Sequence, residues 1–397
     1  MSERLVVVLV VLLAVAISQA AGRRIALRRN VQAAQNRLAY VRAAREHHRQ
    51  LSGNRTDDDD IDIGLVDSII HEFLAEVQVG DPGQVVHVVF DTGSSEIWMS
   101  SSLCDDNTCL LEDHRFDPNL SSTYVGSDRR ESCVYGSGEV EGLIGYDQIQ
   151  IASGVVVERQ SMGLIEAQDG SVFEAGVLDG IVGMSLKGLS SFQDDDDFQE
   201  NLPLIYNMRA QGLLPRGQFA FYFSRDETRR PSELVFGAMD PELYTGSMRW
   251  VDVVGQGFWA VPITKLTIGG IDVRDCNEDN PCYGILDSGS TAFTGPTFVL
   301  EQMAMSFESG TRITDLPRVT FTIGGVDYII EGEEYVICEG VECCPGWTAM
   351  DFPDVNAFIL GDLFLAKYFT IFDLDRHRVG LAPVAPLVGG KRPGNLY

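Results

Sequence analysis

Two aspartates of the chain stand in the same short sequence context. Asp91 ends the apolar run of VVFDTGSSEIWMS, residues 88–100, and Asp287 ends the apolar run of GILDSGSTAFTGP, residues 284–296. A single copy would be read most simply as a strand end closed by an Asx turn. Each copy is followed by a further apolar stretch with glycine, LDGIVG at 178–183 and AFILGD at 357–362. Two coupled elements that recur in the same order predict two related halves.

The chemistry open to such a pair is general acid–base catalysis. If two similar halves pack about a pseudo-two-fold axis, Asp91 and Asp287 meet where the halves join. Two carboxylates in contact cannot both ionise easily, so they share a proton and titrate as a coupled pair. The ionised member can take a proton from water while the neutral member donates to a carbonyl oxygen, which allows hydrolysis without a covalent intermediate.

The residues beside each aspartate fit this arrangement. Gly93 and Gly289 permit a sharp turn and a close approach of the partner loop or of a substrate. The hydroxyls of Ser94 and Ser290 can donate hydrogen bonds to the outer carboxylate oxygens and fix their orientation. The apolar residues before each aspartate predict a setting of low dielectric constant, in which proton sharing is strong.

The elements that must position these residues are predicted to be β-strands. The chain has 397 residues, of which 45% are hydrophobic and 40 are glycine, and this composition indicates a globular protein. Short runs rich in valine, isoleucine and phenylalanine, such as FAFYF and VTFTIGGVDYII, lie beside glycines. This pattern is typical of an antiparallel β protein with tight turns, so we expect an all-β fold.

The first residues carry the pattern of a signal peptide. Arg4 precedes an apolar run from Leu5 to Ile17, and the small residues of Ser18-Gln19-Ala20 suit cleavage after Ala20. An uncleaved membrane anchor is the alternative, but the run is shorter than a membrane-spanning helix requires. We therefore expect a soluble product of the secretory pathway, either secreted or held in an acidic, lysosome-like vesicle.

Charge divides the chain into two parts. Residues 1–56 carry ten arginines and two glutamates, which give a net charge of +8. Residues 57–397 carry a net charge of −36, and the two parts sum to −28. A short basic stretch is often a solvated tail or a nucleic-acid arm. Because it precedes a very acidic body, electrostatic docking onto that body is the better interpretation. Nucleic acid is not an expected partner, since the acidic body would repel phosphates.

Eight cysteines in an exported chain predict disulfides. Two pairs are close in sequence, Cys104 with Cys109 and Cys276 with Cys282, and each would close a short loop. A metal site is the competing interpretation, but no histidine completes a familiar zinc spacing, so no metal is expected. The sequence leaves four cysteines unpaired: Cys133, Cys338, Cys343 and Cys344.

From about Phe73 to Pro383 the chain resembles the pepsin-type aspartic proteases in zymogen form. The resemblance rests on the duplicated D-[ST]-G-[ST] motif and on both apolar-glycine elements. It implies a bilobal all-β fold with pseudo-two-fold symmetry and a cleft between the lobes. The expected organisation is a signal peptide at 1–20, a basic propeptide at 21–68, an N-terminal lobe at 69–245, a C-terminal lobe at 246–388 and a tail at 389–397.

The resemblance also assigns roles to single residues. Asp91 and Asp287 correspond to the catalytic pair, with Ser94, Ser290, Gly93 and Gly289 in support. A β-hairpin flap over bound peptide is expected to contain Tyr135, Gly136 and Ser137, with Trp98 as the hydrogen-bond partner of Tyr135. Apolar positions that match pocket walls, and that could equally be core, are Val89, Tyr135, Val172, Leu178, Ile181, Phe258 and Ile285.

The resemblance implies an aspartic endopeptidase that is favoured by acid, uses no cofactor and prefers apolar residues at the scissile bond. Its expected partners are polypeptide substrates, its own propeptide as an intramolecular inhibitor, and statine-type inhibitors, and it is expected to be a monomer. Glu139 and Cys133 depart from the usual flap sequence. The rival interpretation is a catalytically silent peptide-binding protein on the same fold. Both motifs are intact, which favours the enzyme.

Overall fold

The computed structural model describes most of the chain after residue 72 and one strand before it. The described residues are 23–29, 73–104, 109, 115–135, 138–170, 178–193, 200–214, 216–224, 230–237, 240–273, 276–304, 312–339, 342–352 and 355–386. The expected signal peptide, most of the expected propeptide and the expected tail lie outside them. No helix in this part of the chain is long and apolar enough to cross a membrane.

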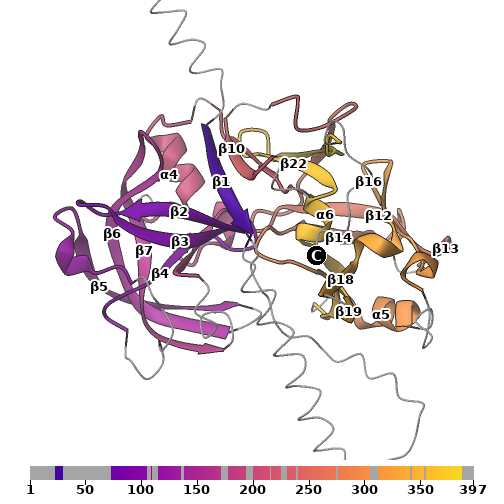
Figure 1. Ribbon diagram of the computed structural model, residues 1–397, viewed down its shortest axis with the longest axis horizontal. Coiled ribbons are helices and arrows are strands. Elements are labelled where there is room, and N and C mark those ends of the chain that lie inside the picture. Colours follow the sequence, from indigo (N-terminus) through magenta and orange to yellow (C-terminus); the bar gives the residue numbers. More distant parts are fainter. Residues whose placement is uncertain are drawn as a thin grey trace, which may run out of the picture.

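The described strands form two large sheets and a small hairpin. The larger sheet has 13 strands in the order β11-β23-β22-β9-β10-β1-β2-β3-β8-β4-β7-β6-β5. The second has eight, in the order β17-β16-β12-β14-β21-β15-β20 with β13 paired to β12, and β18 pairs with β19 alone. Figure 1 shows the N-terminal strands β2–β7 on one side, the C-terminal strands on the other, and β1 between them.

In its described residues, the N-terminal half has seven strands and one helix. They are β2 (Phe73–Val79), β3 (Gln84–Asp91), β4 (Ile97–Ser100), β5 (Val125–Tyr135), β6 (Gly138–Ala152), β7 (Val155–Gly170), β8 (Gly180–Gly183) and α4 (Leu204–Ala210), with the 3-10 turns η1 (Pro118–Leu120) and η2 (Lys187–Leu189).

The C-terminal half is also built mainly from strands. Its elements are β12 (Ala260–Ile268), β13 (Ile271–Asp272), β14 (Cys282–Leu286), β15 (Phe293–Gly295), α5 (Thr297–Ala304), η4 (Ile313–Asp315), β16 (Val319–Ile323), β17 (Val326–Ile330), η5 (Gly332–Glu334), β18 (Val336–Glu339), β19 (Glu342–Pro345), β20 (Trp347–Ala349), β21 (Ala357–Leu360) and α6 (Asp362–Leu365).

The strands between the halves come from both of them and from the N-terminal segment. They are β1 (Arg23–Arg29), β9 (Gln218–Tyr222), β10 (Ser232–Phe236), β11 (Arg249–Asp252), β22 (Tyr368–Asp373) and β23 (Arg378–Pro383). Phe219 of β9 and Phe372 of β22 stack with ring centroids 4.7 Å apart, and Trp259 packs edge-on against both. Burial of these rings holds the two halves together.

The two halves share one strand arrangement around the sequence repeats. In the first, β3 pairs in parallel with β8, which pairs antiparallel with β4. In the second, β14 pairs in parallel with β21, which pairs antiparallel with β15. The apolar-glycine elements of the sequence are therefore the parallel partners of the aspartate strands. The prediction of an all-β fold in two related halves is confirmed.

Candidate active site

Asp91 is the last residue of β3 and is buried, with 5% of its surface exposed. The apolar lead-in Val88-Val89-Phe90 is buried as well, which extends the strand into the interior. Gly93 N donates to Asp91 Oδ1 at 2.7 Å, and Ser94 Oγ donates to Asp91 Oδ2. The turn after β3 therefore supplies two donors that fix the carboxylate.

Asp287 follows β14 and is held in the same way. It is 8% exposed and comes after the buried pair Ile285-Leu286. Gly289 N donates to Asp287 Oδ1 at 2.9 Å, and Ser290 Oγ donates to Asp287 Oδ2 at 2.8 Å. The two aspartates thus receive matching hydrogen bonds from matching positions of the repeat.

The hydroxyls next to the aspartates connect the two loops. Thr92 Oγ1 donates to Leu286 O at 2.8 Å and accepts from Ser288 N at 2.9 Å. In return, Ser288 Oγ donates to Phe90 O at 2.7 Å and accepts from Thr92 N at 3.1 Å. Both side chains are buried, so these four bonds lock the loops in one relative position.

The two carboxylates converge across this junction. A Cβ placed on Gly93 would lie 2.6 Å from Asp287 Oδ1, and one placed on Gly289 would collide with Asp91 Oδ1. Burial raises the pKa of Asp91 well above its ordinary value, and the charge of Asp287 raises it further, against the hydrogen bond from Ser94. A proton is therefore retained in the pair at a pH where an isolated aspartate would lose it.

A cavity of about 620 Å³ opens above the pair. Both aspartates line it, together with Gly93, Ser94, Gly289 and Ser290. Its further walls, which come from both halves, are Ser95, Glu96, Trp98, Glu131, Ser132, Cys133, Val134, Tyr135, Ile144, Leu189, Ser191, Phe192, Phe258, Ile285, Thr291, Ala292, Thr294, Thr348, Met350, Phe352 and Ile359.

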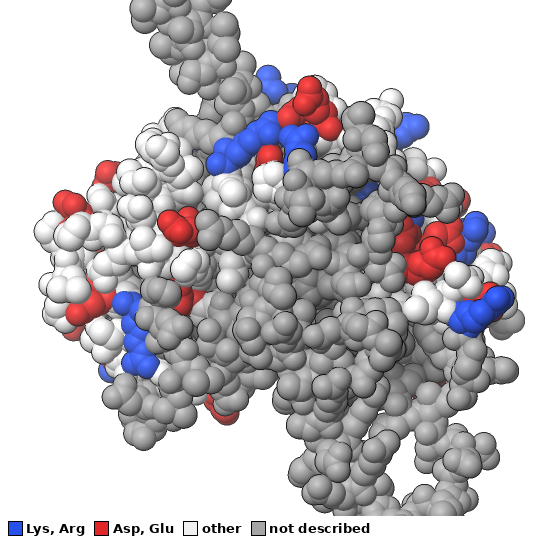
Figure 2. All heavy atoms as spheres, viewed as in Figure 1, with Lys and Arg blue, Asp and Glu red and all other residues white. Residues whose placement is uncertain are grey.

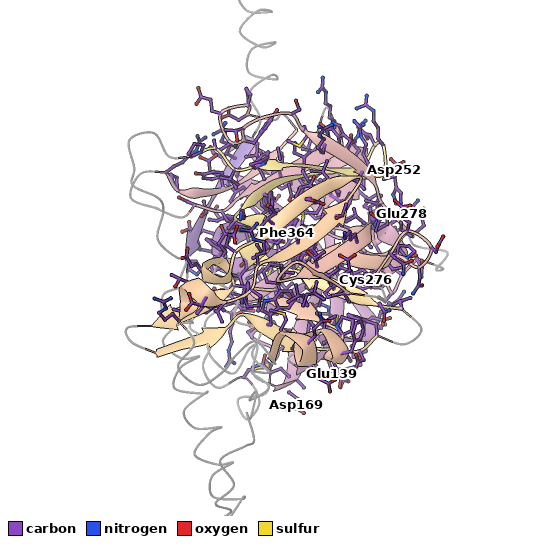
Figure 3. All side chains as sticks on the ribbon, turned by 90° about the vertical axis from the view of Figure 1, so that its right-hand side faces the viewer. Glu139, Asp169, Asp252, Cys276, Glu278 and Phe364 are labelled. Atoms are coloured by element: carbon purple, nitrogen blue, oxygen red, sulfur yellow. A yellow bond between two sulfur atoms is a disulfide. The ribbon has the colours of Figure 1, made fainter. Side chains whose placement is uncertain are left out.

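The strands β5 and β6 form a long hairpin whose β5 end lines the cavity. The register pairs Tyr135 with Gly138, and the expected flap residues Gly136 and Ser137 between them lie outside the described residues. Val134 beside the turn is 75% exposed. At the same end of the molecule Figure 3 shows Glu139 of β6 and Asp169 of β7, which are paired across the sheet.

The expected hydrogen bond between Trp98 and Tyr135 does not form. Trp98 Nε1 and Tyr135 Oη are both buried without a hydrogen-bond partner in the described structure. Tyr135 lies beside Cys133, which is one of the causes, after burial, that raise the pKa of Tyr135. Burial raises the pKa of the Cys133 thiol to about 11, so it is protonated near neutral pH.

The predicted pocket residues divide into two groups. Phe258 and Ile285 line the cavity. Val89, Leu178 and Ile181 do not, because they are buried in a cluster that packs against Trp98 behind the cavity wall. Val172 lies outside the described residues. The sequence could not separate the two groups, since an apolar residue next to the motif suits a core as well as a pocket.

Several wall residues were not identified from the sequence. Glu96 directly follows the DTGSS motif, so its place five residues after Asp91 could have identified it as a residue near the site. Thr92 and Ser288 also escaped notice as links between the loops. No local signal identifies residues such as Met350 and Phe352, which reach the cavity only through the fold.

Among the described side chains, disulfides join Cys104 to Cys109 and Cys276 to Cys282. Cys133 is a free cysteine on β5. In the β18–β19 hairpin the backbone register places Cys338 opposite Cys343 and Ile337 opposite Cys344.

Known proteins are similar to this chain over most of its length. The family model for eukaryotic aspartyl protease matches residues 72–384. Cathepsin E-A of Xenopus laevis is 34% identical over 336 residues, which cover 81% of this chain and 82% of the relative. Pepsin A of Bos taurus is 33% identical over 327 residues, covering 79% and 84%. The chain therefore belongs to the eukaryotic aspartyl protease family, with the pepsin-like fold, and is an aspartic-type endopeptidase.

Proposed function

We propose that Asp91 and Asp287 hydrolyse peptide bonds through a water molecule activated between them. The observation that carries the proposal is the convergence of two buried, identically supported carboxylates beneath one cavity. Burial and the charge of Asp287 raise the pKa of Asp91, so the pair retains one proton, and we propose that Asp91 carries it while Asp287 acts as the base.

The reaction then follows from this assignment. Asp287 takes a proton from the water, whose oxygen attacks the peptide carbonyl carbon, while Asp91 donates its proton to the carbonyl oxygen. The resulting tetrahedral intermediate has two hydroxyl groups. Its C–N bond breaks as the nitrogen receives a proton from Asp287 and a hydroxyl proton returns to Asp91. The products are a carboxylic acid and an amine, and the pair regains its single proton.

The hairpin and the cavity would hold the substrate as an extended strand. Gly93, Gly289 and Ser290 line the cavity next to the pair, and the β5–β6 hairpin with Tyr135 borders it. Gly136 and Ser137 would contact the peptide backbone from the flap, while Trp98 supports Tyr135 by packing. Apolar walls at Phe258, Ile285, Leu189, Phe192 and Ile359 favour apolar side chains at the scissile bond.

The protein would be made as a zymogen that enters the secretory pathway through residues 1–20. Strand β1 supports this, since it is inserted between β10 and β2 and buries Ile25 and Leu27 in the core. Residues 21–68 would act as the propeptide, with β1 as its anchor in the acidic body. An acidic vesicle or the cell exterior is the proposed destination, and a monomer is the proposed form.

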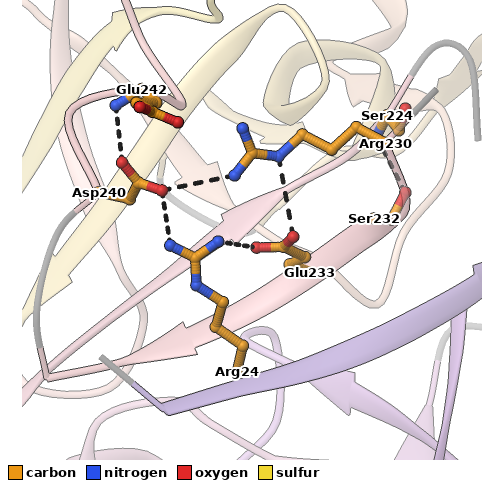
Figure 4. Close-up of polar contacts among 7 residues, drawn as sticks. All are labelled: Arg24, Ser224, Arg230, Ser232, Glu233, Asp240 and Glu242. Carbon is orange, nitrogen blue, oxygen red and sulfur yellow. Dashed lines mark hydrogen bonds and ion pairs between the residues drawn. The ribbon is translucent and has the colours of Figure 1, made fainter. Parts of the chain in front are cut away.

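Charge complementarity at β1 makes the anchor sensitive to acid. Figure 4 shows Arg24 between Glu233 and Asp240, at 2.8 and 2.6 Å, with Arg230 on their other side. Figure 2 shows basic and acidic side chains together at this edge of the molecule. Burial opposes ionisation of Asp240, but Arg24, the backbone of Glu242 and Arg230 outweigh it and lower its pKa. The contact would persist until the pH falls through that lowered value.

The test is cleavage of a quenched peptide with apolar residues at its scissile bond by the acid-treated protein. The proposal predicts activity that a statine-type inhibitor abolishes and that Asp287→Asn lowers by about a thousandfold or more. Circular dichroism checks that the variant is folded. A folded, propeptide-free protein without activity would instead support the silent peptide-binding protein.

A further inference from the structure

Glu96 is a cavity residue whose carboxylate is fixed by neutral groups. It lies on the loop that leads from Asp91 to β4 and is half-buried. Ser95 Oγ donates to Glu96 Oε2 at 2.7 Å, and Ser191 N donates to Glu96 Oε1 at 2.8 Å. The two donors come from different segments, so the carboxylate has a defined place in the wall.

The charged side chains of the described cavity wall are all acidic. They are Asp91, Glu96, Glu131 and Asp287, without a lysine or arginine among the described lining residues. The two aspartates form the proposed catalytic pair. Glu131 accepts a hydrogen bond from Arg129 Nε at 2.6 Å, so its charge is balanced. Within the described part of the chain, Glu96 is the remaining wall carboxylate, and no ion pair balances it.

The charge of Glu96 acts on the side of the cavity that faces the hairpin. Burial is the main cause of the raised pKa values of Cys133 and Tyr135, and the negative charge of Glu96 adds to it at both residues. A peptide held between the pair and the hairpin would therefore pass through the field of Glu96. A half-buried carboxylate has lost part of its hydration, and a cation within bonding distance compensates that loss.

We propose that Glu96 selects peptide substrates that carry lysine or arginine at one position close to the scissile bond. Leu189 lines the cavity two residues before Ser191, which bonds Glu96, and its apolar side chain suits the aliphatic stem of a lysine or arginine. The inference rests on the proposed function, because it assigns a specificity residue to the same cleft.

A set of matched peptides tests the inference. Quenched peptides with one apolar scissile pair receive lysine at each neighbouring position in turn, and a second set has norleucine there, which keeps the stem without the charge. At about pH 5.5, where side-chain carboxylates are mostly ionised, we expect kcat/KM to favour lysine over norleucine by about tenfold at one position. Glu96→Gln should remove that preference and leave cleavage of the norleucine peptide within about twofold.

Glu131→Gln is the matched control, because it removes a wall carboxylate that Arg129 already balances. This variant should keep the preference for lysine. The inference is overturned if the unaltered protein shows no lysine preference at any position, or if Glu96→Gln retains it. Failure of the proposed function has a different signature, since neither peptide set would then be cleaved.

Discussion

Thr92 and Ser288 determine how accurately the two aspartates face each other. Each side chain crosses the junction and both donates to and accepts from the opposite loop. Because these groups are buried, the loss of one partner leaves a carbonyl and an amide without hydrogen bonds in the interior. The hydroxyls therefore contribute to stability and to the geometry of the pair together.

Thr92→Val tests this role at nearly constant shape. It leaves Leu286 O and Ser288 N unpaired, so we expect a loss of about 2–4 kcal/mol in the free energy of unfolding and a lower kcat at unchanged substrate preference. Urea unfolding and steady-state kinetics measure the two effects. Thr245→Val is the control, since Thr245 is exposed and the substitution removes only a long hydroxyl bond to Pro383 O, which Thr245 N also bonds. Equal effects of the two changes would contradict the account.

The parallel strands β8 and β21 fix the position of each aspartate at the end of its own strand. Asp91 pairs with Gly183 in the β3–β8 ladder, and Asp287 N donates to Leu360 O of β21. Glycines at the motif then allow the two loops to approach, because each stands against the carboxylate of the other half. The apolar-glycine elements and the aspartate turns act as one unit in each half.

Gly289→Ala tests the close approach of the loops. Its methyl group would collide with Asp91 Oδ1, so the aspartates must separate. A displacement of about 1 Å costs roughly a hundredfold in rate, and we expect at least that loss in kcat/KM. Gly126→Ala is the matched control, since its added carbon would meet Tyr124 at ordinary contact distances. Full activity of Gly289→Ala would show that the loops do not need this contact.

The aspartate repeat could be predicted because strand, turn and supporting hydroxyl are local in sequence. The Thr92–Ser288 link could not, since a hydroxyl beside an aspartate has many potential partners and this one comes from the other half. Val89, Leu178 and Ile181 match pocket walls by resemblance but are buried in the core, because an apolar residue beside the motif suits either place. Trp98 was expected to bond to Tyr135, but their buried polar atoms make no hydrogen bond in the described structure.

The whole molecule combines a basic N-terminal segment with an acidic body. Strand β1 completes the sheet between the halves, and its Arg24 is held by two carboxylates of the body. The charge asymmetry of the sequence predicted docking of this kind, but neither the strand nor its partners could be predicted. A strand register depends on an edge that only the folded body presents.

Asp240→Asn tests the acid sensitivity of this contact. The lowered pKa of Asp240 keeps it ionised at neutral pH, and protonation in acid removes its attraction to Arg24. The amide cannot ionise, so we expect the variant zymogen to mature at a higher pH than the unaltered protein. Gel electrophoresis of purified zymogen over a pH series measures the midpoint. Asp315→Asn, which alters the exposed pair with Arg312, should leave it unchanged. An unaltered midpoint in Asp240→Asn would count against the anchor.

The central claim is that the pair works with one shared proton, and the pH profile of kcat/KM for the mature protein measures this most directly. Activity should fall at low pH as a second proton binds, and at high pH as the shared proton leaves. The raised pKa of Asp91 places the high-pH decline well above about 3.9, the ordinary value for aspartate. A bell-shaped profile with that upper limb supports the account. Activity that rises steadily to neutral pH and beyond would show that the doubly ionised pair is the active form, and would contradict it.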